Sequence, residues 1–494
     1  MIENIGEAFA LFFTLENIGI LFVGVMIGAV VGAIPGMTTP MGVALALPFT
    51  FTMNPVTGIL LLLGVYKGGL YGGSITAILI KAPGTPAASC TVLDGYPLTQ
   101  NGKARKALDM ALYASCFADF VSNLSLILLA GILATFALKF GPPEFFTLIV
   151  FSLTIIAGVS GEDLVKGMIS AALGLLFATI GLDAVYGTNR FIFDRWELLG
   201  GLSFIPVLIG LFALPEIIRY FAQRVRDNAQ AANMAGEGAT AGEFKRCFKS
   251  IFRGSLIGVC LGAIPGIGGA PSAFLSYSEA KRTSPEGENF GKGELEGVAA
   301  AEAGNNGVAG ATMIPLLALG VPGDVITAVI LGAFMIHGLR PGPVMFVENL
   351  PLIYALFMGI MLSSAYLLII GKLSIRAISR ISEVPNRILY PIVLVFCLFG
   401  SFAINNSIFD VLVMVLMGCV GYIMLVLRFP APPFLIAFIL GPLLEDNFRQ
   451  SMILSEGSLS ILVRSGICWL FWILTALSIF FLIKSRKKNI PLSG

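Results

Sequence analysis

The phrase GAIPG occurs twice in the sequence, at Gly32–Gly36 within GAIPGMTTP and at Gly262–Gly266 within GAIPGIGGAP. Each copy follows a hydrophobic run with the composition of a membrane-spanning helix. Proline lacks a backbone donor and glycine adopts conformations that other residues avoid, so the phrase should end a helix. The same helix-breaking phrase, 230 residues apart (262 − 32), predicts that the chain builds one structural unit twice.

The chain has 494 residues, of which 56% are hydrophobic and only 12% charged, and its mean hydropathy is +0.90. Soluble domains average about 25% charged residues. A membrane-spanning helix needs about 20 apolar residues, and runs near this length recur at 17–34, 143–159, 201–218, 352–371, 388–404, 408–427 and 465–483. These features predict an all-α polytopic membrane protein with roughly 10–12 transmembrane segments.

Composition argues against several classes of function. The net charge of +2 and the lack of basic patches interleaved with aromatic residues argue against nucleic-acid binding. The seven cysteines show no CxxC spacing and His337 is the only histidine, so neither a zinc site nor a histidine-based nucleophile is expected. We expect no enzymatic activity and no cofactor.

A polar, Ala/Gly-rich segment at 225–250 divides the chain into two halves, 1–224 and 251–494. The halves share motifs in the same order. After GAIPG, the pair Pro83-Gly84 matches Pro322-Gly323. DGYP (94–97) then matches HGLRP (337–341), and PVLIGLFALP (206–215) matches PFLIAFILGP (433–442). We interpret the halves as two membrane repeats joined by a polar cytoplasmic linker.

Lysine and arginine cluster in four connecting segments, 103–106, 219–253, 372–380 and 484–488. Such clusters mark cytoplasmic loops. The helix before the second GAIPG follows the basic linker, whereas the helix before the first follows acidic residues only, which predicts two repeats of inverted topology. The N-terminus is then periplasmic and the C-terminus cytoplasmic. The side of the loop 279–296, which carries charges of both signs, stays open.

Interrupted hydrophobic segments at matching places in inverted repeats indicate the binding site of a secondary transporter. Each half has two such breaks, at 36–40 and 83–86 in the first and at 266–271 and 322–324 in the second. The free N–H groups of broken or re-entrant helices suit a carboxylate. The substrate-binding residues predicted on this basis are Gly36, Thr38, Thr39, Lys67, Ser74, Thr76, Gly84, Thr85, Gly266, Ser272, Asn305, Asn306, Thr312 and Gly323.

Ionisable residues in apolar surroundings are functional candidates by default. Glu302 and Asp324 are predicted to bind the coupling ion, Na⁺ or H⁺, and Lys67 to balance an anionic substrate. Each position also has a purely structural interpretation. Gly and Pro kink and pack membrane helices, Ser and Thr bond to their own backbone, and lysine can extend to the membrane surface.

Three long motifs resemble the large membrane subunit of the tripartite tricarboxylate transporters. They are GGLYGGSITAILIKAPGTPAA (68–88), LDGYPLTQNGKARKAL (93–108) and EGVAAAEAGNNGVAGATMIPLLALGVPGDVITAVILGAFMIHGLRPGP (296–343). The resemblance covers nearly the whole chain. It implies a symporter of the bacterial inner membrane that imports an organic di- or tricarboxylate by alternating access. It also implies two partners, a small membrane subunit and a periplasmic substrate-binding protein.

The chain departs from the family pattern at two places. The first break contains PGMTTP where the family more often has a glycine-rich PGLGP-like sequence, and Lys67 and Lys81 stand where uncharged residues are expected. Two other functions stay open at this point. One is a carboxylate carrier without a soluble receptor. The other is an intramembrane hydrolase, suggested weakly by VPGDV at 321–325, in which Val321 replaces the first glycine of a GxGD motif.

Overall fold

The structure is a computed structural model that describes residues 2–34, 36–159, 163–183, 187–223, 237–381 and 386–488. These residues are helical apart from connecting loops and one short hairpin of β1 (Gly181–Leu182) and β2 (Asn189–Arg190). Pro35 of the first GAIPG and residues 225–236 of the expected linker lie outside the described residues. The remainder of that linker leads into α10 (Ala241–Gly262).

Seven helices among the described residues are long and apolar enough to cross a membrane, and five shorter apolar helices accompany them. The long ones are α2 (Leu15–Gly32), α4 (Pro55–Ile80), α6 (Ala104–Ala137), α9 (Phe204–Gln223), α17 (Leu350–Ile381), α19 (Ile408–Val426) and α21 (Gly466–Lys488). The predicted all-α polytopic membrane class is therefore confirmed.

The elements of the two halves follow one another in the same order. The remaining ones of the first half are α1 (Ile2–Phe12), α3 (Thr39–Ala46), η1 (Leu47–Thr52), α5 (Ala88–Gln100), α7 (Pro142–Val159), α8 (Leu164–Ala178) and η2 (Trp196–Leu198). Those of the second half are α11 (Gly269–Thr283), η3 (Gly287–Asn289), α12 (Leu295–Asn306), α13 (Val308–Ala311), α14 (Met313–Leu319), α15 (Val325–Ile336), α16 (Met345–Glu348), α18 (Asn386–Ala403), α20 (Ala431–Leu454) and η4 (Leu459–Val463). The run α12–α14 occupies the place of α4, and α15 that of α5.

Small residues bring the first helices of each half into backbone contact. Glycines four residues apart on α2 face glycines four residues apart on α4, and a Cβ on any of them would overlap backbone atoms of the other helix: Gly24, Gly28, Gly32, Gly64, Gly68 and Gly72. In the second half, Gly254, Gly258 and Gly262 of α10 approach α12 and α13 in the same way. Such stripes let membrane helices pack closely without a hydrophobic driving force.

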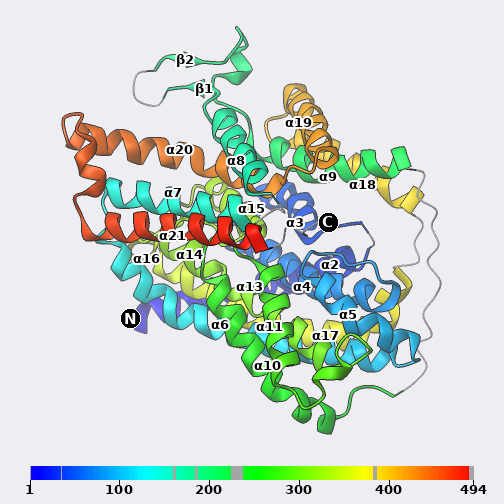
Figure 1. The fold of residues 1–494 in the computed structure, drawn as a ribbon. Helices are drawn as coiled ribbons and strands as arrows, with labels where there is room; N and C mark the ends of the chain where they lie inside the picture. Colours follow the sequence, from blue (N-terminus) through cyan, green and yellow to red (C-terminus); the bar gives the residue numbers. More distant parts are fainter. Residues whose placement is uncertain are drawn as a thin grey trace, which may run out of the picture.

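Each half sends a long helix onto the other. Helix α6 packs against α10, α12, α13 and α14 of the second half, and α17 packs against α2 and α4 of the first. Helices α9 and α19 contact each other, as do α8 and α20. The halves therefore interlock into one body (Figure 1), with the β1–β2 hairpin projecting beyond the helices. The inverted direction of the two repeats stays a prediction.

Candidate functional site

Both GAIPG motifs end a helix and turn the chain through a glycine with positive φ. Helix α2 ends at Gly32, and Gly36 has φ of +86°; α10 ends at Gly262, and Gly266 has φ of +87°. A side chain is strained in this region, so glycine is required. Helices α18 and α7 close over the two turns, because a Cβ on Gly36 would lie 2.5 Å from the Tyr390 hydroxyl and one on Gly266 would overlap Ile156.

The second break of each half follows a residue in the left-handed region. Helix α4 is capped by Lys81 (φ +59°) before α5 begins at Ala88, and α14 is capped by Gly320 (φ +72°) before α15 begins at Val325. Lys81 and Gly320 are 239 residues apart (320 − 81), the same offset as the two Pro-Gly pairs. The breaks predicted from the sequence are therefore present in both halves.

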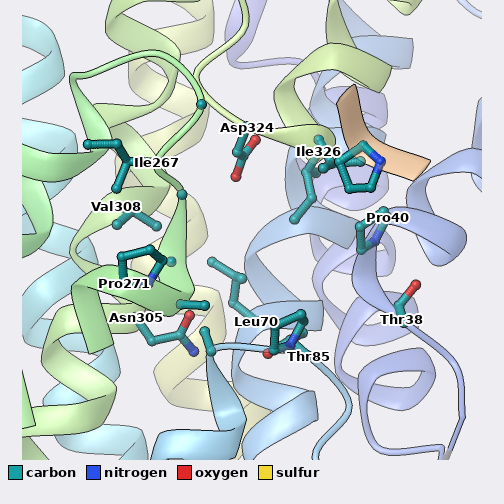
Figure 2. A pocket seen from close by; sticks show the side chains of 18 of the residues that line it. Thr38, Pro40, Leu70, Thr85, Ile267, Pro271, Asn305, Val308, Asp324 and Ile326 are labelled. Carbon is teal, nitrogen blue, oxygen red and sulfur yellow. The ribbon is translucent and has the colours of Figure 1, made fainter. Parts of the chain in front are cut away.

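A cavity of about 310 Å³ lies between the breaks of the two halves (Figure 2). The N-terminal ends of α3, α5, α11 and α15 reach it, through Thr38, Thr85, Gly269 and Asp324. Its remaining wall is mainly apolar and includes Leu70, Phe212, Ile326, Pro432 and Ile436. We call this space the central cavity. A concave, mostly apolar pocket with a few polar groups is the usual form of a small-molecule site.

The four helix N-termini give the central cavity a preference for anions. Unpaired N–H groups and the positive end of the helix dipole stabilise negative charge there. Three ends are capped, because Thr38 accepts from the N–H of Met41 (3.4 Å), Thr85 from that of Ala88 (3.1 Å) and Asp324 from that of Thr327 (2.7 Å). Helix α11 starts instead after Gly268, which has no side chain to cap it. Its first N–H groups are therefore the ones best placed for a ligand.

Asn305 of α12 is the polar side chain of the cavity wall without a partner. It is fully buried, and within the described part of the chain neither its amide oxygen nor its amide nitrogen makes a hydrogen bond. Figure 2 shows the amide among the side chains that line the cavity. It lies beside the start of α11, since a Cβ on Gly269 would be 2.9 Å from its Oδ1. An unpaired buried amide costs about 1–3 kcal/mol unless a ligand satisfies it.

Behind the cavity wall, a short hydrogen-bond chain connects the two halves. The Tyr66 hydroxyl of α4 lies 3.1 Å from Thr312 Oγ1 and donates to Asp324 Oδ2 at 3.3 Å. The Asp324 carboxylate also accepts from the Thr327 N–H, and the Thr327 hydroxyl oxygen accepts from the Asp324 N–H, which completes the capping box of α15. The carboxylate is thus fixed by its own helix and by the opposite half.

Glu302 lies away from the central cavity, in a fully buried polar cluster between α5, α6 and α12. The Thr91 hydroxyl donates to one carboxylate oxygen, and the Ser115 hydroxyl donates to the other at 3.0 Å. The Asn306 amide donates to Ser115 Oγ at 2.8 Å and to the carboxylate at 3.3 Å. We call these four residues the Glu302 cluster.

Lys67 does not line the central cavity either. Its ammonium group pairs with Asp119 of α6 and donates to Asn123 Oδ1 at 2.7 Å. Ser364 of α17 donates to the other oxygen of Asp119 at 2.6 Å. All these groups are buried. This Lys67 cluster, made of Lys67, Asp119, Asn123 and Ser364, supplies its own counter-charge.

Five of the predicted site residues line the central cavity: Thr38, Thr85, Gly266, Asn305 and Asp324. The others lie in the packing around it. Gly84 and Gly323 allow close backbone contact, Ser272 donates to the Gly304 carbonyl at 2.8 Å, and Thr39 packs against Gly69. Lys81 lies outside, 5.9 Å from the Tyr96 ring centre. Four other predicted positions also lie outside the cavity wall: Gly36, Ser74, Thr76 and Thr312.

Sequence reasoning missed the polar face of α6 except for Asp119, an ionisable residue in an apolar run. Ser115, Asp119, Ser122 and Asn123 all point into the protein interior and bond to α4, α12, α13 or α17. Ser122 Oγ accepts from the N–H groups of Gly310 and Ala311, at the interruption of the second half. Polar residues at intervals of three and four in a long apolar helix could have indicated this face.

Comparison with known proteins now decides the family. The model of the tripartite tricarboxylate transporter TctA family matches residues 18–436. The chain belongs to this family. A relative from Agrobacterium vitis, named "Uncharacterized 52.8 kDa protein in TAR-I ttuC' 3'region", is 36% identical over 467 residues, which cover 94% of this chain and 93% of the relative.

A second relative from Agrobacterium vitis, "Uncharacterized protein in TAR-II ttuC' 3'region", is 35% identical over 210 residues, 42% of this chain and 87% of the relative. No solved structure matches. The family is one of transporters, so the protein is a multi-pass membrane transporter and not an enzyme. The hydrolase alternative is thereby set aside, and Asp324 of VPGDV caps a helix.

Proposed function

We propose that this TctA-family protein imports an organic di- or tricarboxylate together with Na⁺ or H⁺, and that the carboxylate binds in the central cavity. The observation that carries the proposal is the unpaired Asn305 amide beside the uncapped start of α11. A carboxylate oxygen would accept from the helix N–H groups and from the Asn305 amide, which is otherwise buried without a partner among the described residues.

The position of the cavity supports alternating access as the mechanism. The cavity is bounded by breaks from both halves, so a movement of one rigid unit against the rest would open it to one side of the membrane and then to the other. The family supports the two expected partners. In this proposal a periplasmic binding protein delivers the carboxylate and a small membrane subunit completes the transporter in the inner membrane.

The first experiment is the thermal stability of the purified protein against mono-, di- and tricarboxylates, with and without Na⁺. A ligand that binds only the folded state adds about 2.7 kcal/mol at a hundredfold excess over its Kd. We expect one carboxylate class to raise the unfolding temperature, and Na⁺ to enlarge that shift if Na⁺ is the coupling ion. If no carboxylate stabilises the protein, alone or with its partner proteins, the proposed substrate class is wrong.

The matched variants are Asn305→Leu and Asn54→Ala. Asn305→Leu should abolish the carboxylate-dependent shift. The ligand-free protein should keep or gain stability, because a leucine side chain of similar shape replaces an unpaired buried amide. Asn54 is exposed at the start of α4 and makes no capping bond, so Asn54→Ala should behave like the parent protein. Unchanged carboxylate stabilisation of Asn305→Leu would remove the central cavity from the proposal.

A further inference from the structure

The Glu302 cluster contains a buried negative charge without a positive partner. Glu302 is fully buried, and among the described residues no lysine, arginine or histidine forms an ion pair with it. Tyr71 of α4 and Cys90 of α5 interact with it electrostatically, and neither carries positive charge. An isolated carboxylate inside a membrane protein is very costly unless a cation or a proton neutralises it.

The other buried charges cannot supply that positive charge. Lys67 is already committed to Asp119, and this pair is neutral by itself. Asp324, the other predicted coupling-ion residue, has its charge stabilised by the N-terminus of α15, by Thr327 and by Tyr66. Glu302 therefore differs from Asp324 in needing a charge from outside the chain.

The groups around Glu302 are of the kind that bind a small hard cation. The Thr91 and Ser115 hydroxyls contact the carboxylate. Each hydroxyl can rotate so that its oxygen lone pairs ligate a cation and its hydrogen points elsewhere. The Ser74 hydroxyl of α4 is also fully buried and lies near enough to Glu302 to stabilise its negative charge. Carboxylate, hydroxyl and amide oxygens are the ligands that hard cations prefer.

We propose that the Glu302 cluster binds the single positive charge, Na⁺ or a proton, that is transported with the carboxylate. This rests on the proposed function. Asn306 of the cluster is the neighbour of Asn305 on α12, so the two sites share one interrupted stretch of backbone. Occupation of one site therefore changes the affinity of the other, and the effect is reciprocal.

The test measures cation binding without any carboxylate. The unfolding temperature of the parent protein, Glu302→Gln and the control Glu296→Gln is recorded against NaCl with choline chloride keeping ionic strength constant, and against pH in the absence of Na⁺. Glu296 is a matched control because it lies six residues away (302 − 296) on α12 and also accepts from two serine hydroxyls, at 2.5 and 2.6 Å. The site predicts a response to Na⁺ or to pH in the parent and in Glu296→Gln, and a flat response in Glu302→Gln.

A Na⁺ response identifies the ion as sodium, and a response to pH alone identifies it as a proton. If Glu302→Gln keeps the full response of the parent, the inference is wrong, whatever the carboxylate experiments show. If Glu302→Gln loses the response but no protein is stabilised by a carboxylate, the cation site stands and the proposed substrate fails. If Glu302→Gln does not fold, the variants Thr91→Val and Ser115→Ala test the cation site instead. Each should raise the half-saturating Na⁺ concentration, or shift the pH midpoint, by roughly tenfold, and no change in either variant would overturn the site.

Discussion

Two buried polar clusters lie one turn apart on the inner face of α6, and only one of them contains its own counter-charge. Asp119 pairs with Lys67, whereas Ser115 contacts Glu302, which has no positive partner among the described residues. A self-neutralised pair holds helices in place whatever is bound. An unbalanced carboxylate makes the conformation depend on a bound ion, and this difference separates a structural cluster from a coupling site.

The internal repeat makes the same contrast sharper. The offset of 239 residues that aligns the two Pro-Gly pairs also aligns Lys67 with Asn306 and Leu63 with Glu302. The backbone breaks, the glycine stripes and the order of the helices are common to both halves. The buried charges are not. If the two halves are repeats, as the sequence predicts, duplication accounts for the frame of the site, and single residues in each half account for its chemistry.

The largest expected effect comes from breaking the Lys67 cluster. Lys67→Met leaves Asp119 charged and buried, which should lower the free energy of unfolding by about 3–5 kcal/mol. The double variant Lys67→Met with Asp119→Asn removes both charges and keeps the hydrogen bonds to Ser364, so it should recover most of the lost stability. Chemical unfolding in detergent measures both.

Chemical unfolding of Glu302→Gln tests the difference between the Glu302 cluster and the Lys67 cluster. This variant removes an uncompensated charge, so the ion-free protein should lose far less stability than Lys67→Met does, or gain some. An equal loss in the two variants would mean that Glu302 is as well balanced in the protein as Lys67. The distinction between the two clusters would then be lost.

A smaller effect tests whether the halves are packed alike. A Cβ on Gly28 would overlap the backbone of α4, and one on Gly258 would lie 2.7 Å from Gly307. Gly28→Ala and Gly258→Ala should each destabilise the protein by about 1–3 kcal/mol. Gly19→Ala is the control, because nothing lies within 4 Å of a Cβ at this position of α2. A loss at Gly28 without one at Gly258 would show that only the first glycine stripe is tight.

The fold and the breaks were predictable because they depend on local rules. Glycine at 36 and 266 is needed for positive φ, and the hydrophobic runs fix the helices. The same rules placed Thr38, Thr85, Gly266, Asn305 and Asp324 on the cavity wall. These residues lie at or beside a helix interruption, where composition alone indicates exposed backbone.

The partners of the buried charges were not predictable in this way. Lys67 and Asp119 are 52 residues apart and Thr91 and Glu302 are 211 apart, and the sequence does not state which helices will meet. The role of Lys67 depended on that missing information: next to the cavity it would balance a substrate, but in the structure it faces α6 and α17. The apolar wall residues Phe212, Pro432 and Ile436 were missed for the same reason.

The smallest expected effect concerns a backbone position at which the halves share a conformation but not a residue type. Lys81 and Gly320 both cap a helix in the left-handed region, where a side chain costs about 1 kcal/mol. Lys81→Gly should therefore be more stable than Lys81→Ala by about 1 kcal/mol. Because both variants lose the contact of the lysine with the Tyr96 ring, their difference isolates the backbone. Gly320→Ala should show a larger loss in the other half, because its Cβ would also lie 2.7 Å from the Pro341 carbonyl oxygen. The thermal unfolding midpoints of the three variants measure these differences, and equal midpoints for Lys81→Gly and Lys81→Ala would show that the first half does not hold this residue in the left-handed conformation.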